Sequence, residues 1–153
     1  MNILSRLFGK VERQVADPLF GLLRQKNRCW DGEVAWPYGG HNVYLSVCRA
    51  PDEPTQVDRD VYQALCENYL RLLPAIRQSL FELWGPVHPD ATWDGPRPSS
   101  PQELFNMLEL GGLFIEQGSR VELHYNFAGD TWPDGMFTVA IQGNTVEPVA
   151  FDD

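Results

Sequence analysis

Apolar and polar side chains alternate with a helical period across the middle of the chain, from Thr55 to Trp84. The apolar residues recur every three or four positions, the spacing that lines one face of an α-helix. They are Val57, Val61, Ala64, Leu65, Leu72, Ala75, Ile76, Leu80 and Leu83. Asp58 completes a capping box with the first residue, and Gly85 with Pro86 forms a stop. We predict one long helix against which the rest of the chain packs.

Pro74 interrupts this helical pattern. A proline has no N–H to donate to the carbonyl of Leu70, and an interior proline costs about 3 kcal/mol. Two outcomes stay open at this point. The helix kinks near Leu73, or two helices meet with Pro74 in the first turn of the second.

On both sides of the helix the pattern changes to period two, which is typical of strands with one buried face. The segments with this character are residues 19–23, 30–36, 43–48, 113–117, 121–127, 137–142 and 145–151. Turn-forming residues separate them at Arg24–Arg28 and Pro37–His41, and tight hairpins are expected at Gly118-Ser119 and Gly143-Asn144. The sequence therefore predicts mostly hairpin-connected strands.

Two further helical signals flank these elements. Ser100, Pro101 and Glu103 supply a cap, a first-turn proline and a box glutamate, so a short helix is expected to start there and to end at Gly111-Gly112. Residues 2–15 form a basic amphipathic pattern. That segment docks on its own domain, frays, or binds a membrane surface or partner.

These elements predict an α+β fold. The expected architecture is an antiparallel sheet of about six strands, with the long helix, kinked or broken, and the short helix on one face. Residues 1–16 would form an N-terminal amphipathic helix or tail, and residues 17–153 a single domain. The other sheet face would stay partly open and show Glu122, His124, Asn126, Thr138 and Gln142.

The amino-acid composition limits the classes of protein to which this chain could belong. A hydrophobic fraction of 43% is enough for a core, but no apolar run is long enough for a membrane span or resembles a secretory signal. The three cysteines, Cys29, Cys48 and Cys66, are odd in number and widely spaced, which argues against a disulfide framework. We therefore expect a cytoplasmic protein, because cysteines stay reduced there.

The charge is unevenly distributed along the chain. Residues 1–29 carry six basic and two acidic side chains, a formal charge of +4, whereas residues 30–153 carry six basic and nineteen acidic ones, a formal charge of −13. An acidic body repels phosphate backbones, so nucleic acid is a poor partner. It would attract a basic protein surface and speed the encounter with it.

A tryptophan–aspartate motif occurs three times, at residues 30–32, 93–95 and 132–135. One interpretation is turn chemistry, with each tryptophan anchoring its loop on the core. The other is that these loops gather at one end and bind a partner through tryptophan and carboxylate groups. On the second interpretation the partner-binding residues are Asp31, Glu33, Trp93, Asp94, Asp130, Trp132 and Asp134.

Other chemistry finds little support in the sequence. Asp130 and Asp134 could hold a divalent cation or act as acid and base, but the loop lacks the ligand spacing of a calcium site. His41, His88 and His124 show no zinc spacing. We expect no catalytic residue, no metal and no cofactor.

The layout as a whole resembles a group of small bacterial domains. The features that carry the resemblance span residues 17–143: Phe20-Gly21-x-Leu23, Trp30-x-Gly32-x-Val34, the long helix, the Ser/Pro-started short helix, and the Gly129–Gly135 loop entering Phe137-x-Val139-x-Ile141. Several such families resemble the immunity proteins of polymorphic and contact-dependent toxin systems. The resemblance implies a small, acidic, cytoplasmic protein without enzymatic activity that binds a toxin domain and blocks it.

The leading hypothesis is thus a non-enzymatic acidic binding protein, an immunity-like inhibitor of a basic toxin or nuclease domain. One alternative is a small-molecule or divalent-metal-dependent enzyme that uses Asp130, Asp134 and His124. Another is a membrane-peripheral adaptor that uses residues 2–15. A homodimer through the open sheet face or the N-terminal helix is a further arrangement that the sequence leaves open.

Overall fold

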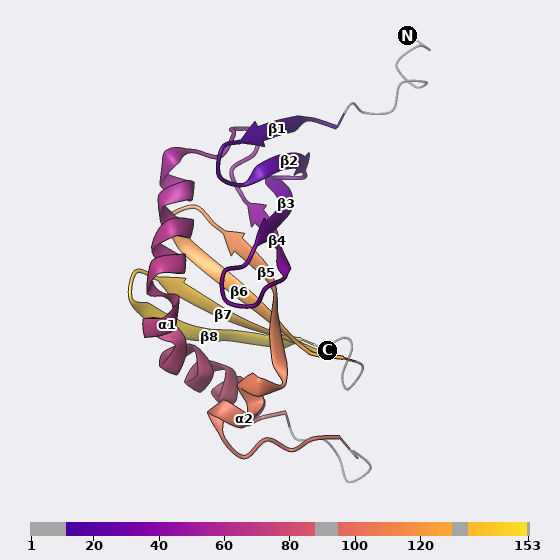
Figure 1. Cartoon of the computed structure of the whole chain (residues 1–153), viewed down its shortest axis with the longest axis vertical. Coiled ribbons are helices and arrows are strands. Elements are labelled where there is room, and N and C mark those ends of the chain that lie inside the picture. The colour runs from indigo at the N-terminus through magenta and orange to yellow at the C-terminus, as the bar shows by residue number, and fades with distance from the viewer. Residues whose placement is uncertain (1–11, 88–94, 130–134, 153) are drawn as a thin grey trace.

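One eight-stranded sheet with two helices on one of its faces makes up the structure (Figure 1). The structure is a computed structural model and describes residues 12–87, 95–129 and 135–152. The strands are β1 (Gln14–Asp17), β2 (Gly21–Lys26), β3 (Cys29–Ala35), β4 (Asn42–Val47), β5 (Leu108–Ile115), β6 (Arg120–Phe127), β7 (Met136–Gln142) and β8 (Thr145–Asp152). The helices are α1 (Gln56–Trp84) and α2 (Pro101–Asn106). The predicted α+β class is confirmed.

The strands lie in the sheet in the order of the sequence, from β1 to β8. Every neighbouring pair is antiparallel except β4 and β5, which are parallel. The chain leaves β4, passes through α1 and α2, and re-enters the sheet beside β4 in the same direction. A parallel pair needs such a crossover, because a tight hairpin can only reverse the chain.

The prediction of about six strands was too low. Gln14 and Val15 belong to β1, although the helical spacing of residues 2–15 had placed them in an amphipathic helix or tail. β2 continues to Lys26 through the predicted turn. β5 starts at Leu108, so Gly111 and Gly112 lie within a strand, at a register shift, rather than at the end of the short helix.

α1 is one continuous helix of 29 residues with Pro74 inside it, so the alternative of two separate helices was wrong. The ribbon changes direction in its second half, where it approaches α2 (Figure 1). The predicted capping box is present, since the Asp58 carboxylate accepts from the Thr55 N–H at 2.7 Å. No helix in the described part of the chain is both long enough and apolar enough to cross a membrane.

The core lies between the helices and the sheet face they cover. Alternate residues of β6, from Val121 to Phe127, and of β7, from Phe137 to Ile141, are buried there. Ile76 and Leu80 of α1 are completely buried against them. The predicted period-two pattern therefore identifies the buried side of β6 and β7. The helical pattern was right for Leu65, Leu72, Ile76 and Leu80, but Val57, Ala64 and Ala75 of the predicted buried face are exposed.

Two buried carboxylates fix the start of α1 to the neighbouring strands. Asp58 also accepts from the Arg49 guanidinium at 2.6 Å, just beyond β4. Asp17, at the end of β1, accepts from Arg59 of α1 at 2.6 Å and caps the following turn through the Leu19 and Phe20 N–H groups. Both acids are needed for architecture, so neither belongs to a candidate site.

The first tryptophan–aspartate motif does not form a turn. Trp30, Asp31 and Gly32 lie in the middle of β3. Trp30 is fully buried and donates its indole N–H to the Asp52 carbonyl at 2.6 Å, so the expected anchoring role is confirmed. Gly32 is required by close packing, because a Cβ there would lie 2.6 Å from a Leu23 methyl group. The turn interpretation was therefore wrong for this copy.

Cys29 and Cys48 form a disulfide between β3 and the residue that follows β4. The expectation that the cysteines stay unpaired was wrong for these two. Their separation of 19 residues gave no sign of pairing, because only the register of the two strands places them opposite one another. Cys66 of α1 is a free thiol.

Candidate partner-binding face

The structure describes only two of the seven predicted partner-binding residues. Asp31 and Glu33 are neighbours on one face of β3. The other five, which belong to the two later tryptophan–aspartate loops, lie outside the described residues: Trp93, Asp94, Asp130, Trp132 and Asp134. The convergence of the three loops is therefore still a prediction. The described part of the candidate site is the sheet face that carries Asp31 and Glu33.

That face is the side of the sheet turned away from the helices. At its centre three rings from adjacent strands form a row, which we call the ring row: Tyr44 of β4, Phe114 of β5 and His124 of β6. The Tyr44 and Phe114 centroids are 5.7 Å apart, and the Phe114 and His124 rings stack at 4.2 Å with an interplanar angle of 19°. The ring row spans three adjacent strands, and β5 and β6 are far from β4 in the sequence.

Gly112 of β5 provides space for the ring row. A Cβ at this position would lie 3.2 Å from the Phe114 ring and 3.8 Å from both Tyr44 and His124. Because the glycine has no side chain, the three rings can lie flat against the backbone. The face is thus shaped to present rings rather than a continuous polar surface.

The ring row also covers part of the face that was expected to be open. Thr138, predicted to be exposed there, is 5% exposed, and Ser46 is 2% exposed. His124, Glu122 and Asn126 are half-buried, while Gln142 is exposed as predicted. Tyr44 remains 39% exposed, so one end of the ring row is accessible to a partner.

Carboxylates flank the accessible end of the ring row. The Ser46 hydroxyl donates to Asp31 Oδ1 at 2.7 Å, which holds that side chain in place. Glu33 lies directly opposite Tyr44 in the strand pairing and is exposed. Burial and the neighbouring Asp31 carboxylate raise the pKa of Tyr44 to about 12, so its hydroxyl stays protonated and able to donate.

At the other end, Arg120 joins a cluster of acids. Its guanidinium lies 3.2 Å from Glu116, 3.1 Å from Glu122 and 2.6 Å from Glu147. One cation thus serves three carboxylates, and the cluster keeps a formal charge of −2. Together with Asp31 and Glu33, this cluster places carboxylates on both sides of the ring row.

His124 is the most unusual polar group in the ring row. Its Nε2 is buried and lies 3.6 Å from Glu122 Oε2, which is too long for a hydrogen bond. Burial lowers the pKa of His124, and the Glu122 carboxylate opposes this effect only in part. The ring is therefore neutral near pH 7 and belongs with the aromatic side chains in its packing.

A broad open groove of about 620 Å³ runs beside Tyr44 over β2, β3 and β4. Asp31, Glu33 and the 55% exposed Leu22 line it, and so do Arg24 and Lys26. The groove thus combines exposed apolar surface with both acidic and basic side chains. Such a mixture fits a polypeptide better than a small substrate.

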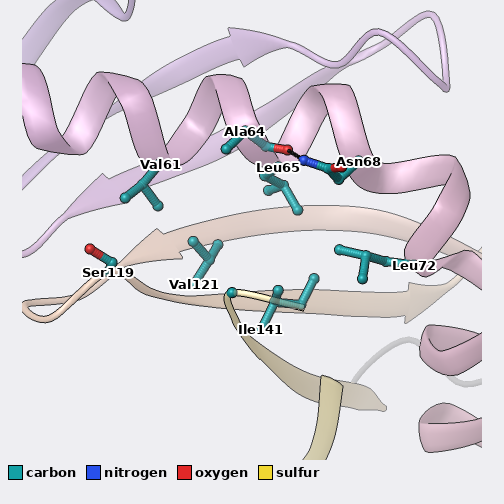
Figure 2. A pocket seen from close by; sticks show the side chains of 9 residues that line it. Val61, Ala64, Leu65, Asn68, Leu72, Ser119, Val121 and Ile141 are labelled. Atoms are coloured by element: carbon teal, nitrogen blue, oxygen red, sulfur yellow. Dashed lines mark hydrogen bonds between the residues drawn. The ribbon is translucent and has the colours of Figure 1, made fainter. Parts of the chain in front are cut away.

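A second hollow lies on the opposite side of the sheet, between α1 and the ends of β6 and β7 (Figure 2). Val61, Leu65 and Leu72 point from the helix toward Val121 and Ile141 of the sheet. The hollow measures about 150 Å³, and none of its lining residues is titratable. It therefore offers apolar surface without catalytic groups.

The described residues contain no group of three or more histidine, cysteine, aspartate or glutamate side chains that could hold a metal. The loop with Asp130 and Asp134, which the enzyme hypothesis needs, lies outside them. Comparisons of the chain with protein-family models, with curated proteins and with solved structures found no match.

Sequence reasoning missed Tyr44 and Phe114 as members of a site. Each had been assigned only to an alternating strand pattern, and nothing local distinguishes them from other outward-facing strand residues. The parallel pairing of β4 with β5 places Tyr44 opposite Gly112 and next to Phe114. Only knowledge of that register could have identified them.

Proposed function

We propose that this chain is a non-enzymatic binding protein that takes up a basic protein surface on the ring row and its flanking carboxylates. The observation that carries the proposal is an aromatic row that is accessible at its Tyr44 end and has carboxylates on both sides of it on one sheet face. Aromatic side chains are enriched among the residues that dominate binding energy at interfaces. Carboxylates around them favour a positively charged partner and increase its rate of encounter.

The charge of the whole chain supports the same class of partner. Residues 30–153 carry a formal charge of −13, so the field of the body reinforces the local acids. The resemblance to immunity proteins suggests a basic toxin or nuclease domain as the partner, and binding would then block the active surface of that domain. In this proposal the ring row supplies affinity, whereas the acids supply steering and specificity.

The test starts from affinity capture. The full chain, immobilised at low salt, should retain a basic protein from an extract of its source cell, and the retained protein is then purified. Three variants are compared with the wild type for binding to it: Tyr44→Ala, the double variant Asp31→Asn with Glu33→Gln, and the double variant Glu67→Gln with Glu82→Gln. The last pair lies on exposed positions of α1 and removes the same number of charges.

The proposal predicts different kinetic effects for these variants. Loss of Asp31 and Glu33 charges should lower the association rate about tenfold at low salt, and the effect should shrink as salt screens the field. Tyr44→Ala should raise the dissociation rate about tenfold or more, since truncating an aromatic anchor commonly costs above ~1 kcal/mol. The α1 pair should change either rate less than about twofold.

Two results would contradict the proposal. Equal effects of the two double variants would mean that net charge alone, rather than this face, controls the association rate. Capture of no basic protein, or of one whose binding is unaffected by Tyr44→Ala, would remove the ring row from the interface.

A further inference from the structure

A crevice on the helix side of the sheet combines aromatic walls with unused hydrogen-bond donors. It has a volume of about 270 Å³ and lies where the β3–β4 turn meets α1, α2 and the start of β5. We call it the aromatic crevice and define it by its ring-bearing residues: Trp36, Tyr38, His41, Tyr69, Phe105 and Tyr125. None of these residues belongs to the ring row.

The rings support one another from four different elements. Trp36 and Tyr69 pack edge to face at 4.9 Å, and Tyr38 lies 4.9 Å from Tyr69. Phe105 of α2 packs 5.9 Å from Tyr125 of β6. The Tyr38 hydroxyl donates to the Cys66 carbonyl, which ties the β3–β4 turn to α1. The walls are thus positioned before any ligand arrives.

The hydroxyl groups of Tyr69 and Tyr125 form a pair at 2.8 Å. Either one can donate to the other, but a pair of hydroxyls carries two protons and this contact uses one. Tyr69 is 4% exposed and Tyr125 1% exposed, and no acceptor for the second proton occurs among residues 12–87, 95–129 and 135–152. A buried donor without a hydrogen-bond partner is unfavourable. A ligand inside the crevice that accepts a hydrogen bond from this hydroxyl pair would therefore be stabilised there.

Positive charge lies close to this hydroxyl pair. Arg77, two helical turns beyond Tyr69, stacks 5.0 Å over the Phe105 ring, and its buried Nε has no hydrogen-bond partner within the described structure. Burial raises the pKa of Tyr69, and the hydrogen bond with Tyr125 and the charge of Arg77 oppose this effect only in part. The hydroxyl therefore remains protonated while the local field favours an anion.

His41 lies at the edge of the aromatic crevice and adds a second positive charge there when it is protonated. Its Nε2 lies 2.9 Å from the Leu110 carbonyl and its Nδ1 lies 3.1 Å from the Gly39 carbonyl. Only the doubly protonated ring can donate to both carbonyls. Both contacts therefore raise the pKa of His41, and the contact with the Leu110 carbonyl has the larger effect. Glu109 at the rim is the opposing acid.

From this arrangement we infer that the aromatic crevice binds a small planar aromatic carboxylate. The ring of the ligand would lie among the aromatic walls, and its carboxylate would accept from the Tyr69–Tyr125 pair within the field of Arg77 and His41. The volume is sufficient, since a cavity of about 150 Å³ holds a benzene ring. This site is separate from the proposed protein-binding face and does not depend on it.

The experiment compares three probes on the full chain: benzoate, benzamide and benzylammonium. Binding is followed by NMR through the indole N–H signal of Trp36, which is assigned with a Trp36→Phe variant. Benzoate should shift this signal in a saturable manner, with a dissociation constant in the millimolar range or below. Benzylammonium should bind at least tenfold more weakly, and benzamide should fall between them.

Variants separate this crevice from the other apolar hollow. The double variant Tyr69→Phe with Tyr125→Phe keeps both rings but removes both hydroxyls, and should weaken benzoate binding about tenfold, as expected for a lost hydrogen bond to a charged group. Arg77→Met should weaken benzoate more than benzamide. Ala64→Leu, which fills the hollow between α1 and the sheet, should leave the affinity unchanged.

Several outcomes would overturn the inference. These are the absence of a saturable shift with benzoate, binding of benzylammonium as tight as that of benzoate, or loss of benzoate binding in Ala64→Leu. Unchanged affinity in the double variant Tyr69→Phe with Tyr125→Phe would also overturn it. Contacts between the benzoate ring and Phe105 or Tyr38 protons, measured in the wild type, check the location without relying on any variant.

Discussion

The buried carboxylate of Asp58 is predicted to be one of the largest single contributors to stability. It is 1% exposed and receives three hydrogen bonds: from Arg49 Nε at 2.6 Å, from the Thr55 N–H at 2.7 Å and from the Thr55 hydroxyl at 3.1 Å. Asp58→Ala removes the acceptor for all three. The guanidinium of Arg49, itself 24% exposed, would then lose its counter-charge.

The magnitude follows from these contacts. Breaking a buried ion pair by removing one partner costs about 3–5 kcal/mol, because the remaining charge is left uncompensated. Arg49 keeps some access to water, so we expect a loss near the lower limit, about 3 kcal/mol. For a domain of this size each kcal/mol corresponds to about 2–4 °C in Tm, which gives a decrease of about 6–12 °C.

Urea unfolding followed by circular dichroism measures this change. The matched control is Asp60→Ala, an exposed acid in the same helical turn. Its side-chain partner within the described structure is Gln56 at 2.8 Å, and the change should alter stability by less than about 0.5 kcal/mol. Arg49→Met together with Asp58→Ala should cost less than the sum of the two single changes. A loss below about 1 kcal/mol for Asp58→Ala, or strict additivity, would refute the reasoning.

Two further predictions concern pH and the interior proline. Because burial lowers the pKa of His124, stability should rise with pH between its native pKa and the unfolded value of 6.5, and His124→Phe should remove this acid loss while keeping the stack on Phe114. His41 has the opposite effect, because its raised pKa adds stability below pH 6.5 that is lost as the pH rises through the native pKa. Urea unfolding from about pH 5 to 8 distinguishes the two histidines. Identical stability-versus-pH profiles for His124→Phe and wild type would contradict the assignment of the acid loss to His124. Pro74→Ala restores the N–H that the Leu70 carbonyl lacks and should raise the free energy of unfolding by up to about 2 kcal/mol, after allowance for the greater entropy of the unfolded chain. A lower thermal midpoint for Pro74→Ala than for wild type would show that the helix direction imposed by the proline is required for packing.

The elements predicted best are those whose signals are local. The start of α2 is an example: the Ser100 hydroxyl accepts from the Glu103 N–H at 3.2 Å, and the Glu103 carboxylate accepts from the Ser99 N–H at 2.7 Å. Both contacts join residues at most four positions apart, so the sequence contains the whole interaction. The hairpin at Gly118-Ser119 is predictable for the same reason, since both residues adopt positive φ in the turn.

The candidate site was predicted only in part, because it depends on contacts between distant segments. Asp31 and Glu33 were expected to bind a partner, and the strand predicted over residues 30–36 is present as β3, but their position on a sheet face beside Tyr44 was not predicted. Tyr44 meets Phe114 only through the β4–β5 pairing, and Phe114 meets His124 only through the β5–β6 pairing. Period two predicts which residues share a face of one strand, but it carries no information on which strand lies beside it.

The sequence alone determines a long capped helix, a short Ser/Pro-started helix, hairpin-connected strands and an acidic body. Those properties arise from residues close together in the chain or from simple charge summation. The tertiary structure decided the number of strands, the Cys29–Cys48 disulfide, the ring row and the aromatic crevice. Each of these features depends on the register between segments that are distant in sequence. Some of these segments are separated by α1 and α2, and others are short strands whose register is only weakly specified. The physical reason is that such registers minimise the free energy of the whole core and not of any local stretch.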